Sequence, residues 1–177
     1  MKSSSLQNCL HSLNLAEQAV QNLFGPLESY YRSFTEEIRS MRTGFGSLTE
    51  NRIEDFVSAY IDAVKTSVTV LKTKPSAEEI VKESKQLLST PMPQADTQEL
   101  RSKIVEFSRK VDERTNDFVR EFFQNLYEAR GSLNDLLSQR EVKNLSLPGL
   151  ICYHVSSCCR KSPLDRYIQE REDRHQF

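Results

Sequence analysis

Apolar residues recur from Leu6 to Leu48 at alternating steps of four and three. The series is Leu6, Leu10, Leu13, Val20, Phe24, Leu27, Tyr31, Phe34, Ile38, Met41, Phe45 and Leu48, and Glu17 is the only break in it. A helix with this heptad repeat presents one narrow apolar stripe, which must be covered by another helix. The pattern therefore predicts helix-on-helix packing, and the covering helix belongs either to this chain or to a partner.

Gly and Pro residues divide the rest of the pattern into predicted helices. Gly25-Pro26 interrupts the first stripe, but the heptad register continues across it, which favours a kink or a tight stop and restart. Ser or Asp residues followed three positions later by Glu, the pattern of a capping box, predict further helix starts. The expected helices cover about 4–24, 26–42, a segment from the box at 47–50 to just before Pro75, 76–89 from a second box, and a long segment from a third box at 96–99, with a restart after Gly131.

The later helices also have apolar faces at helical spacing. The face expected for the helix before Pro75 is Ile53, Phe56, Val57, Tyr60, Val64, Val68 and Leu71. The long helix carries Leu100, Ile104, Phe107, Val111, Arg114 or Thr115, Phe118, Phe122, Leu126, Ala129 and Leu133. Phe122 and Phe123 cannot share one narrow stripe, so a bundle of at least three helices is expected there. The residues expected to be largely buried are Phe34, Ile38, Phe56, Tyr60, Ile104, Phe107, Val111, Phe118 and Phe122.

No segment shows a convincing strand-like alternation, so the predicted fold class is all-α. We expect an elongated antiparallel helical bundle with coiled-coil-like heptad packing. One bundle domain would cover residues 1–143, with arms 4–89 and 96–143 joined by the proline linker 90–95. Residues 144–177 would form a Cys-containing, partly ordered C-terminal tail, whose last helix is highly charged and should fray or dock weakly.

Composition limits the classes of function. Only 37% of the 177 residues are hydrophobic and 28% are charged, with a net charge of −1. This mixed charge lacks the basic face that nucleic-acid binding needs. The N-terminus shows no secretory signal and no run approaches a membrane span, so the four Cys are expected to be reduced thiols in a cytoplasmic or nuclear protein.

The search for catalytic patterns finds no phosphate-binding Gly-rich loop, no HExxH and no Gly-x-Ser-x-Gly. His11, His154 and His175 are far apart in sequence. We therefore expect a non-enzymatic protein with no cofactor, no metal and no small-molecule substrate. It would act as an interaction or scaffold subunit that binds protein partners, or itself, through amphipathic helices.

The segment from Cys152 to Cys159 contains the only local cluster of soft ligands. Adjacent Cys158 and Cys159 rarely reach one zinc ion together, and no second ligand pair lies nearby. Both thiols precede Arg160-Lys161 and follow an apolar stretch, so S-acylation is an alternative that would make the protein a peripheral membrane adaptor. The simplest interpretation is that these Cys pack as small hydrophobic residues.

The N-terminal helix is the expected partner-binding face. It has the weakest part of the stripe, because Glu17 occupies an apolar position, and Gly25-Pro26 would let it swing. A short isolated helix is marginal in water, so a partner would order it. The residues assigned to this face, expected to be uncovered in the isolated protein, are Leu6, Leu10, Leu13, Val20 and Phe24.

Overall fold

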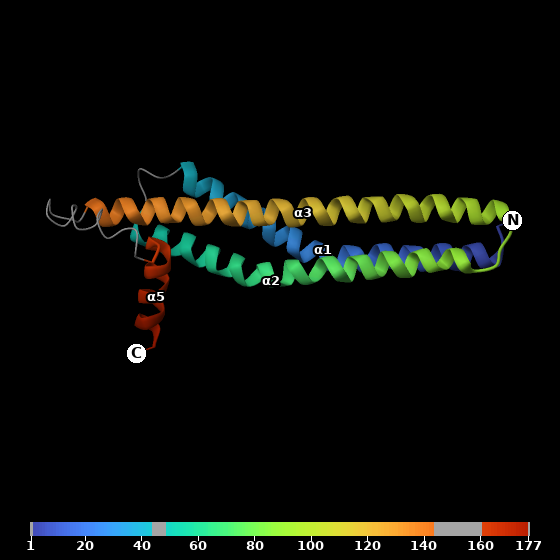
Figure 1. The fold of residues 1–177 in the computed structure, drawn as a ribbon, viewed down its shortest axis with the longest axis horizontal. Helices are drawn as coiled ribbons and strands as arrows, with labels where there is room; N and C mark the ends of the chain where they lie inside the picture. The colour runs from blue at the N-terminus through green and yellow to red at the C-terminus, as the bar shows by residue number, and fades with distance from the viewer. Residues whose placement is uncertain (1, 44–48, 144–160, 177) are drawn as a thin grey trace. The chain divides into compact units, whose positions relative to one another are not determined.

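The computed structural model describes residues 2–43, 49–143 and 161–176, and nearly all of them are helical. The α-helices are α1 (Ser4–Thr43), α2 (Glu50–Gln86), α3 (Gln94–Lys143) and α5 (Pro163–His175), and a short 3-10 turn, Leu87–Ser89, follows α2 (Figure 1). No strand occurs in these described ranges. The long helices pack on one another, which confirms the all-α bundle expected from the heptads.

The helices pass through three residues that were expected to divide them. Pro26 lies inside α1, so of the two alternatives expected there a kink remains and the stop and restart is ruled out. Pro75 lies inside α2 and Gly131 inside α3, so the predicted end before Pro75 and restart after Gly131 are wrong. All three residues are exposed, on the side of the helix away from the core. A proline there removes one backbone hydrogen bond, but the carbonyl it frees can bond to water. Packing on the opposite side is therefore kept.

The helix starts differ from the predicted capping boxes. At the start of α2 the Thr49 hydroxyl accepts a hydrogen bond from the Arg52 N–H at 3.4 Å. Ser47 lies outside the described residues. The Ser76 hydroxyl donates back to the Lys72 carbonyl at 3.2 Å instead of opening a helix. The third box lies within the first turns of α3, which begins at Gln94, two residues earlier than expected.

The chain divides into two compact units, and each contains parts of all three long helices. Unit 1 comprises Met1–Ser33 and Lys65–Phe123, and unit 2 comprises Phe34–Val64 and Gln124–Phe177. In unit 1, α1 and α2 run in opposite directions, as do α2 and α3 (Figure 1). The segment 4–89 thus contains two long helices, α1 and α2, followed by the short 3-10 turn.

Aromatic rings fill the core of unit 1 where α1 meets α3. The rings of Phe24 and Phe118 meet edge to face with centroids 5.9 Å apart, and Tyr31 meets Phe118 at 5.7 Å. Phe122 extends the cluster, 6.1 Å from Phe118. The Arg114 guanidinium lies 5.0 Å above the Phe24 ring and binds both carboxylate oxygens of Glu28, at 2.7 and 2.8 Å. This arrangement fixes α1 against α3.

The predicted core is confirmed at all nine positions. The exposed fraction does not exceed 7% at Phe34, Ile38, Phe56, Tyr60, Ile104, Phe107, Val111, Phe118 and Phe122. At the position left open between Arg114 and Thr115, the structure buries Thr115, whose hydroxyl donates to the Val111 carbonyl.

The predicted face of α2 is wrong in its second half. Val64, Val68 and Leu71 are 42%, 53% and 55% exposed. The buried positions are instead Ala63, Val70, Thr73, Ala77, Val81 and Ser84. Apart from Thr73, they continue the heptad from Tyr60 with smaller side chains. The prediction followed the largest residues and lost the phase of the repeat.

The C-terminal helix α5 packs within unit 2, contrary to the expectation of a weakly docked end. Its Leu164 is fully buried and its Tyr167 is 4% exposed. Arg130 of α3 binds the Asp165 carboxylate at 3.1 Å, and Arg166 binds Glu141 at 2.7 Å. These contacts anchor a helix that is too short and polar to be stable alone.

We expect Phe118→Ala to destabilise the protein by about 3–5 kcal/mol, because it removes a ring that packs between Phe24 and Tyr31. Denaturant unfolding followed by circular dichroism measures this change. Tyr127→Ala is the control, because Tyr127 is 75% exposed on the same helix and should change the stability by less than about 0.5 kcal/mol. Equal losses in the two variants would contradict the described core.

The docking of α5 should weaken at alkaline pH. Burial raises the pKa of Tyr167, and the Glu50 and Glu54 carboxylates act in the same direction. The fold therefore favours the neutral phenol. This stability is fully present below the unfolded-state pKa of about 10 and is lost as the pH rises through the folded-state pKa.

Tyr167→Phe removes this titration, so its stability should fall less than that of the wild type above about pH 10 in urea unfolding. Tyr127→Phe, at an exposed position, should follow the wild type. A Tyr167→Phe profile that parallels the wild type would mean that Tyr167 ionises freely in the folded protein.

Candidate protein-interaction surface

The residues assigned to a partner face on α1 lie in the core of unit 1. Leu6 and Phe24 are fully buried, Val20 and Leu13 are 3% and 4% exposed, and Leu10 is half-buried. The expectation that these side chains are uncovered is therefore wrong. The stripe is covered by α2 and α3 of the same chain, so a partner could reach it only by opening the bundle.

The other candidate sites receive no support from the described residues. Cys158 and Cys159 lie outside them, as does the rest of the Cys152 cluster. Cys9, the free thiol that is described, is 5% exposed and packs in the core. Within residues 2–43, 49–143 and 161–176, no group of His, Cys, Asp and Glu side chains could hold a metal ion. None of the helices in these ranges has an apolar stretch long enough to cross a bilayer.

The shifted pKa values have local structural causes. Lys110, one turn from Glu106, lowers the pKa of that exposed carboxyl through a hydrogen bond and its charge. Hydrogen bonds from Gln124 and Arg42, together with the charge of Arg42, lower the pKa of Glu128. A hydrogen bond to Tyr60 raises the pKa of Arg130. These groups belong to separate surface contacts and do not converge on one pocket.

A groove between α1 and α2 of unit 1 is the most distinctive surface feature. Its volume is about 330 Å³, and its walls are largely aliphatic. Leu15 is 51% exposed there, although residues of this type are usually covered. The side chains that line the groove are Ser12, Leu15, Ala16 and Ala19 from α1, with Ile80, Glu83, Ser84 and Leu87 following along α2 and the turn after it.

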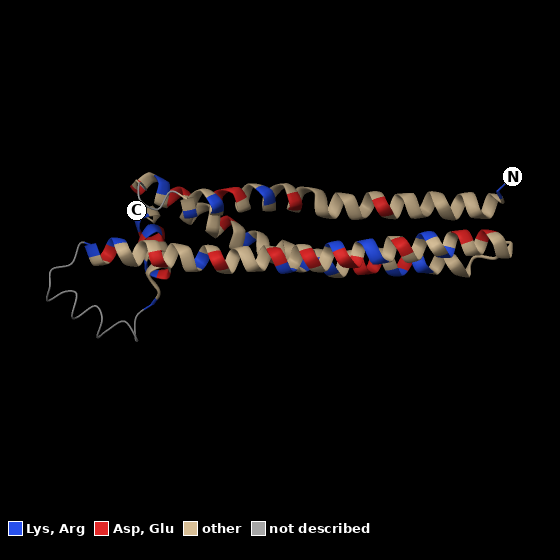
Figure 2. Cartoon of the chain, turned by 90° about the horizontal axis from the view of Figure 1, so that it is seen from above, with Lys and Arg blue, Asp and Glu red and all other residues tan. Residues whose placement is uncertain are grey.

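The α1 wall of this groove is almost free of charge. Glu17 is the only Asp, Glu, Lys or Arg between Ser4 and Leu27, whereas charged residues are frequent along α2 and α3. Figure 2 shows the N-terminal half of α1 as a long tan stretch, next to helices that alternate blue and red. A low content of charged residues is the compositional feature that distinguishes the centre of a protein interface from the rest of the surface.

The groove between α1 and α3 has a different character. It measures about 290 Å³, and its lining includes the charged residues Glu17, Lys103, Glu106 and Lys110. Polar contacts also join these two helices: Lys2 binds Glu99 at 2.7 Å, and Arg114 binds Gln21 at 3.2 Å in addition to Glu28. This side of α1 is therefore lined by charged and polar side chains, whereas the α2 side is largely aliphatic.

Small side chains on α2 account for the open groove. The buried positions that face the bundle there include Ala77, Val81 and Ser84, and α1 contributes Ala16 and Ala19 at its edge. These residues leave unfilled space beside Leu15 and Ile80. Sequence reasoning missed the surface because it searched for large apolar residues. The run of uncharged residues in α1 was the signal that could have revealed it.

The chain matches no protein-family model, no curated protein and no solved structure. Helical bundles support many unrelated functions, so the fold by itself does not indicate one. Any function must therefore be inferred from the geometry and the charge of the groove between α1 and α2.

A pair of substitutions should separate the core side of α1 from the groove side. Leu13→Gln places an amide in the core and should cost several kcal/mol, whereas Leu15→Gln should change the stability by less than about 1 kcal/mol. Gln is a good helix former, so helix propensity is matched. The midpoints of urea unfolding compare the two. A large loss in Leu15→Gln would show that the groove is closed in solution.

Proposed function

We propose that this protein is a non-enzymatic interaction subunit that binds a helix of a partner in the α1/α2 groove of unit 1. The observation that supports this function is the combination, in one place, of an exposed aliphatic groove and a helix face without charge. An aliphatic groove between two helices is the geometry that recognises an amphipathic helix.

Burial of aliphatic side chains would drive the binding of a partner helix in this groove. A partner helix would cover Leu15, Ile80 and Leu87, and each aliphatic side chain removed from water contributes up to about 1.5–3 kcal/mol. The α1 wall carries no charge that would have to be desolvated, and unpaired buried charge is the largest penalty in such interfaces. Binding here would leave the existing core intact.

The alternative function, a peripheral membrane adaptor, depends on acylation of Cys158 and Cys159. These residues lie outside the described part of the chain, and no described feature favours that function. We therefore propose the interaction subunit alone.

Charges placed in the groove should abolish partner binding. Ser12→Arg with Leu15→Arg changes two exposed positions of the groove wall and should reduce partner capture at least about tenfold, because the partner's aliphatic residues would meet cations. Capture is measured by quantitative mass spectrometry after affinity purification from cells. Thermal melting confirms that the variant is folded.

The matched control is Gln7→Arg with Gln18→Arg. Both positions are exposed on α1 outside the groove, and the change in net charge is the same. This control should retain partner capture. If the two double variants behave alike, the groove is not the binding surface.

A further inference from the structure

We propose that the groove of unit 1 binds helix α2 of a second copy of this chain, so that copies associate head to tail. The residues that enter the groove are Val64, Val68 and Leu71, which follow one another on α2 at steps of four and three. These three residues are called the α2 ridge below. The inference rests on the proposed function, because it uses the same groove and names the helix that fills it.

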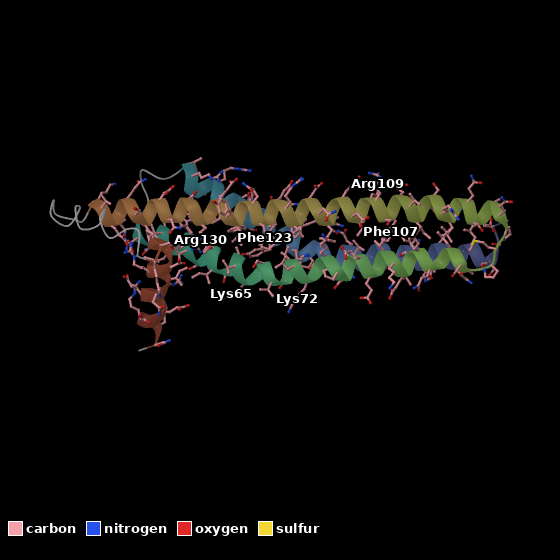
Figure 3. The ribbon with its side chains drawn as sticks, viewed as in Figure 1. Lys65, Lys72, Phe107, Arg109, Phe123 and Arg130 are labelled. Carbon is pink, nitrogen blue, oxygen red and sulfur yellow. The ribbon has the colours of Figure 1, made fainter. Side chains whose placement is uncertain are left out.

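The α2 ridge is an exposed line of aliphatic side chains. Each of its three residues is at least 42% exposed. Single exposed apolar residues are normal on a protein surface, whereas contiguous ones mark contact surfaces. Lys65 and Lys72 border the ridge, and Figure 3 shows both on the side of α2 away from α3. The ridge therefore has the composition of one face of an amphipathic helix, with cations along its outer edge.

The ridge and the groove match in length and in bulk. Val64–Leu71 spans seven residues, and so do the two stretches that wall the groove, Ser12–Ala19 and Ile80–Leu87. Each therefore covers about 10 Å of helix at 1.5 Å per residue. The groove walls contain the small residues Ala16 and Ser84, so the occupant must supply the bulk. Two valines and a leucine at helical spacing supply it.

The charges of the two surfaces are complementary. Glu83 is the only charged residue that lines the groove, and Lys65 and Lys72 border the ridge. All three side chains are exposed, and no ion pair among the described residues involves them. Asp62 is the only acid from Tyr60 to Pro75, so the helix that carries the ridge is basic there. Opposite charges orient two proteins as they meet.

One chain can use both surfaces at the same time, because they lie on opposite sides of α2. Leu71 comes one position after buried Val70, whereas Ile80 comes three positions after buried Ala77 of the same heptad row. At about 100° per residue, these two directions differ by about 160° around the helix. A copy whose groove is filled therefore keeps its own ridge exposed. The contact is heterologous, so association continues to a filament or closes into a ring.

Other occupants would cover only one of the two surfaces. A helix of a different protein would fill the groove and leave the α2 ridge in water. A bilayer is flat and would touch the ridge without entering the groove. A second copy covers both aliphatic surfaces in one contact, and this coincidence on a single chain supports it as the occupant.

Light scattering on the purified full-length chain tests the inference. The average mass should rise with concentration above the 20.5 kDa of one chain. The groove variant, Ser12→Arg with Leu15→Arg, and the ridge variant, Val68→Arg with Leu71→Arg, should each remain monomeric, because either one places cations in the apolar contact. Thermal melting establishes that both variants are folded.

The matched control is again Gln7→Arg with Gln18→Arg, which makes the same change in net charge at exposed positions outside the groove and the ridge. This variant should associate as the wild type does. A wild type that stays at the monomer mass at every concentration would overturn the inference. So would groove and ridge variants that associate as strongly as the control.

A mixing experiment tests the head-to-tail geometry. The groove variant retains an intact ridge, and the ridge variant retains an intact groove. Mixed in equal amounts, the two should form a 1:1 complex of about twice the monomer mass and nothing larger, since only one intact contact is present. If both variants are monomeric alone and no complex forms on mixing, the ridge does not enter the groove and the inference is wrong.

The outcomes separate this inference from the function on which it rests. If the purified chain is monomeric while Ser12→Arg with Leu15→Arg abolishes capture of other proteins from cells, the groove binds a different protein. The proposed function then stands and this inference fails. If these substitutions change neither self-association nor capture, both proposals fail.

Discussion

The heptad phase is the constraint on which the rest of this fold depends. A narrow apolar stripe stabilises a helix only while each turn presents a residue to the same neighbours. Phe24 and Leu27 do so on either side of Pro26, and Ala129 and Leu133 do so around Gly131. A proline inside a helix costs about 3 kcal/mol, and burial of two large side chains offsets that cost. The helices therefore continue through residues that would end an isolated helix.

The position of a helix breaker within the repeat decides its effect, and this could have been seen in the sequence. Pro26, Pro75 and Gly131 all fall on the outward phase of their helices, where no core contact is lost. Counting Gly and Pro without their phase predicted separate helices on either side of Pro75. The fold class was nevertheless predicted correctly, because the apolar stripes require helix-on-helix packing whether or not the helices are interrupted.

The core was predictable where large residues coincide with the repeat, as in α3, and unpredictable where they do not. In α2 the large residues Val68 and Leu71 lie outside the repeat, and Ala77 and Ser84 lie within it. Choosing residues by size therefore moved the predicted face toward solvent. Strict continuation of the register from Tyr60 selects Ala63, Val70, Ala77, Val81 and Ser84 correctly, but it selects exposed Lys74 in place of buried Thr73.

The docking of α5 could not be predicted from local sequence, because its contacts join positions far apart in the chain. Arg130 and Asp165 are separated by 35 residues, and Tyr167 and Glu50 by 117. The helix itself is mostly polar, which normally indicates a solvated end. It is ordered because Ser162 and Asn134 bind its first backbone N–H groups and because Leu164 is buried. Capping and ion pairing here replace the broad apolar face of the longer helices.

The candidate surface follows from an asymmetry in how α1 is held within unit 1. On one side, Arg114 joins α1 to α3 through Glu28 and the Phe24 ring. This contact does not involve the side of α1 that faces α2. On the α2 side, small residues leave a groove whose aliphatic walls are uncovered. A helix that enters this groove adds buried area without breaking an existing contact. The partner face that we propose is thus the second side of α1, while the heptad stripe that first marks this helix forms the core.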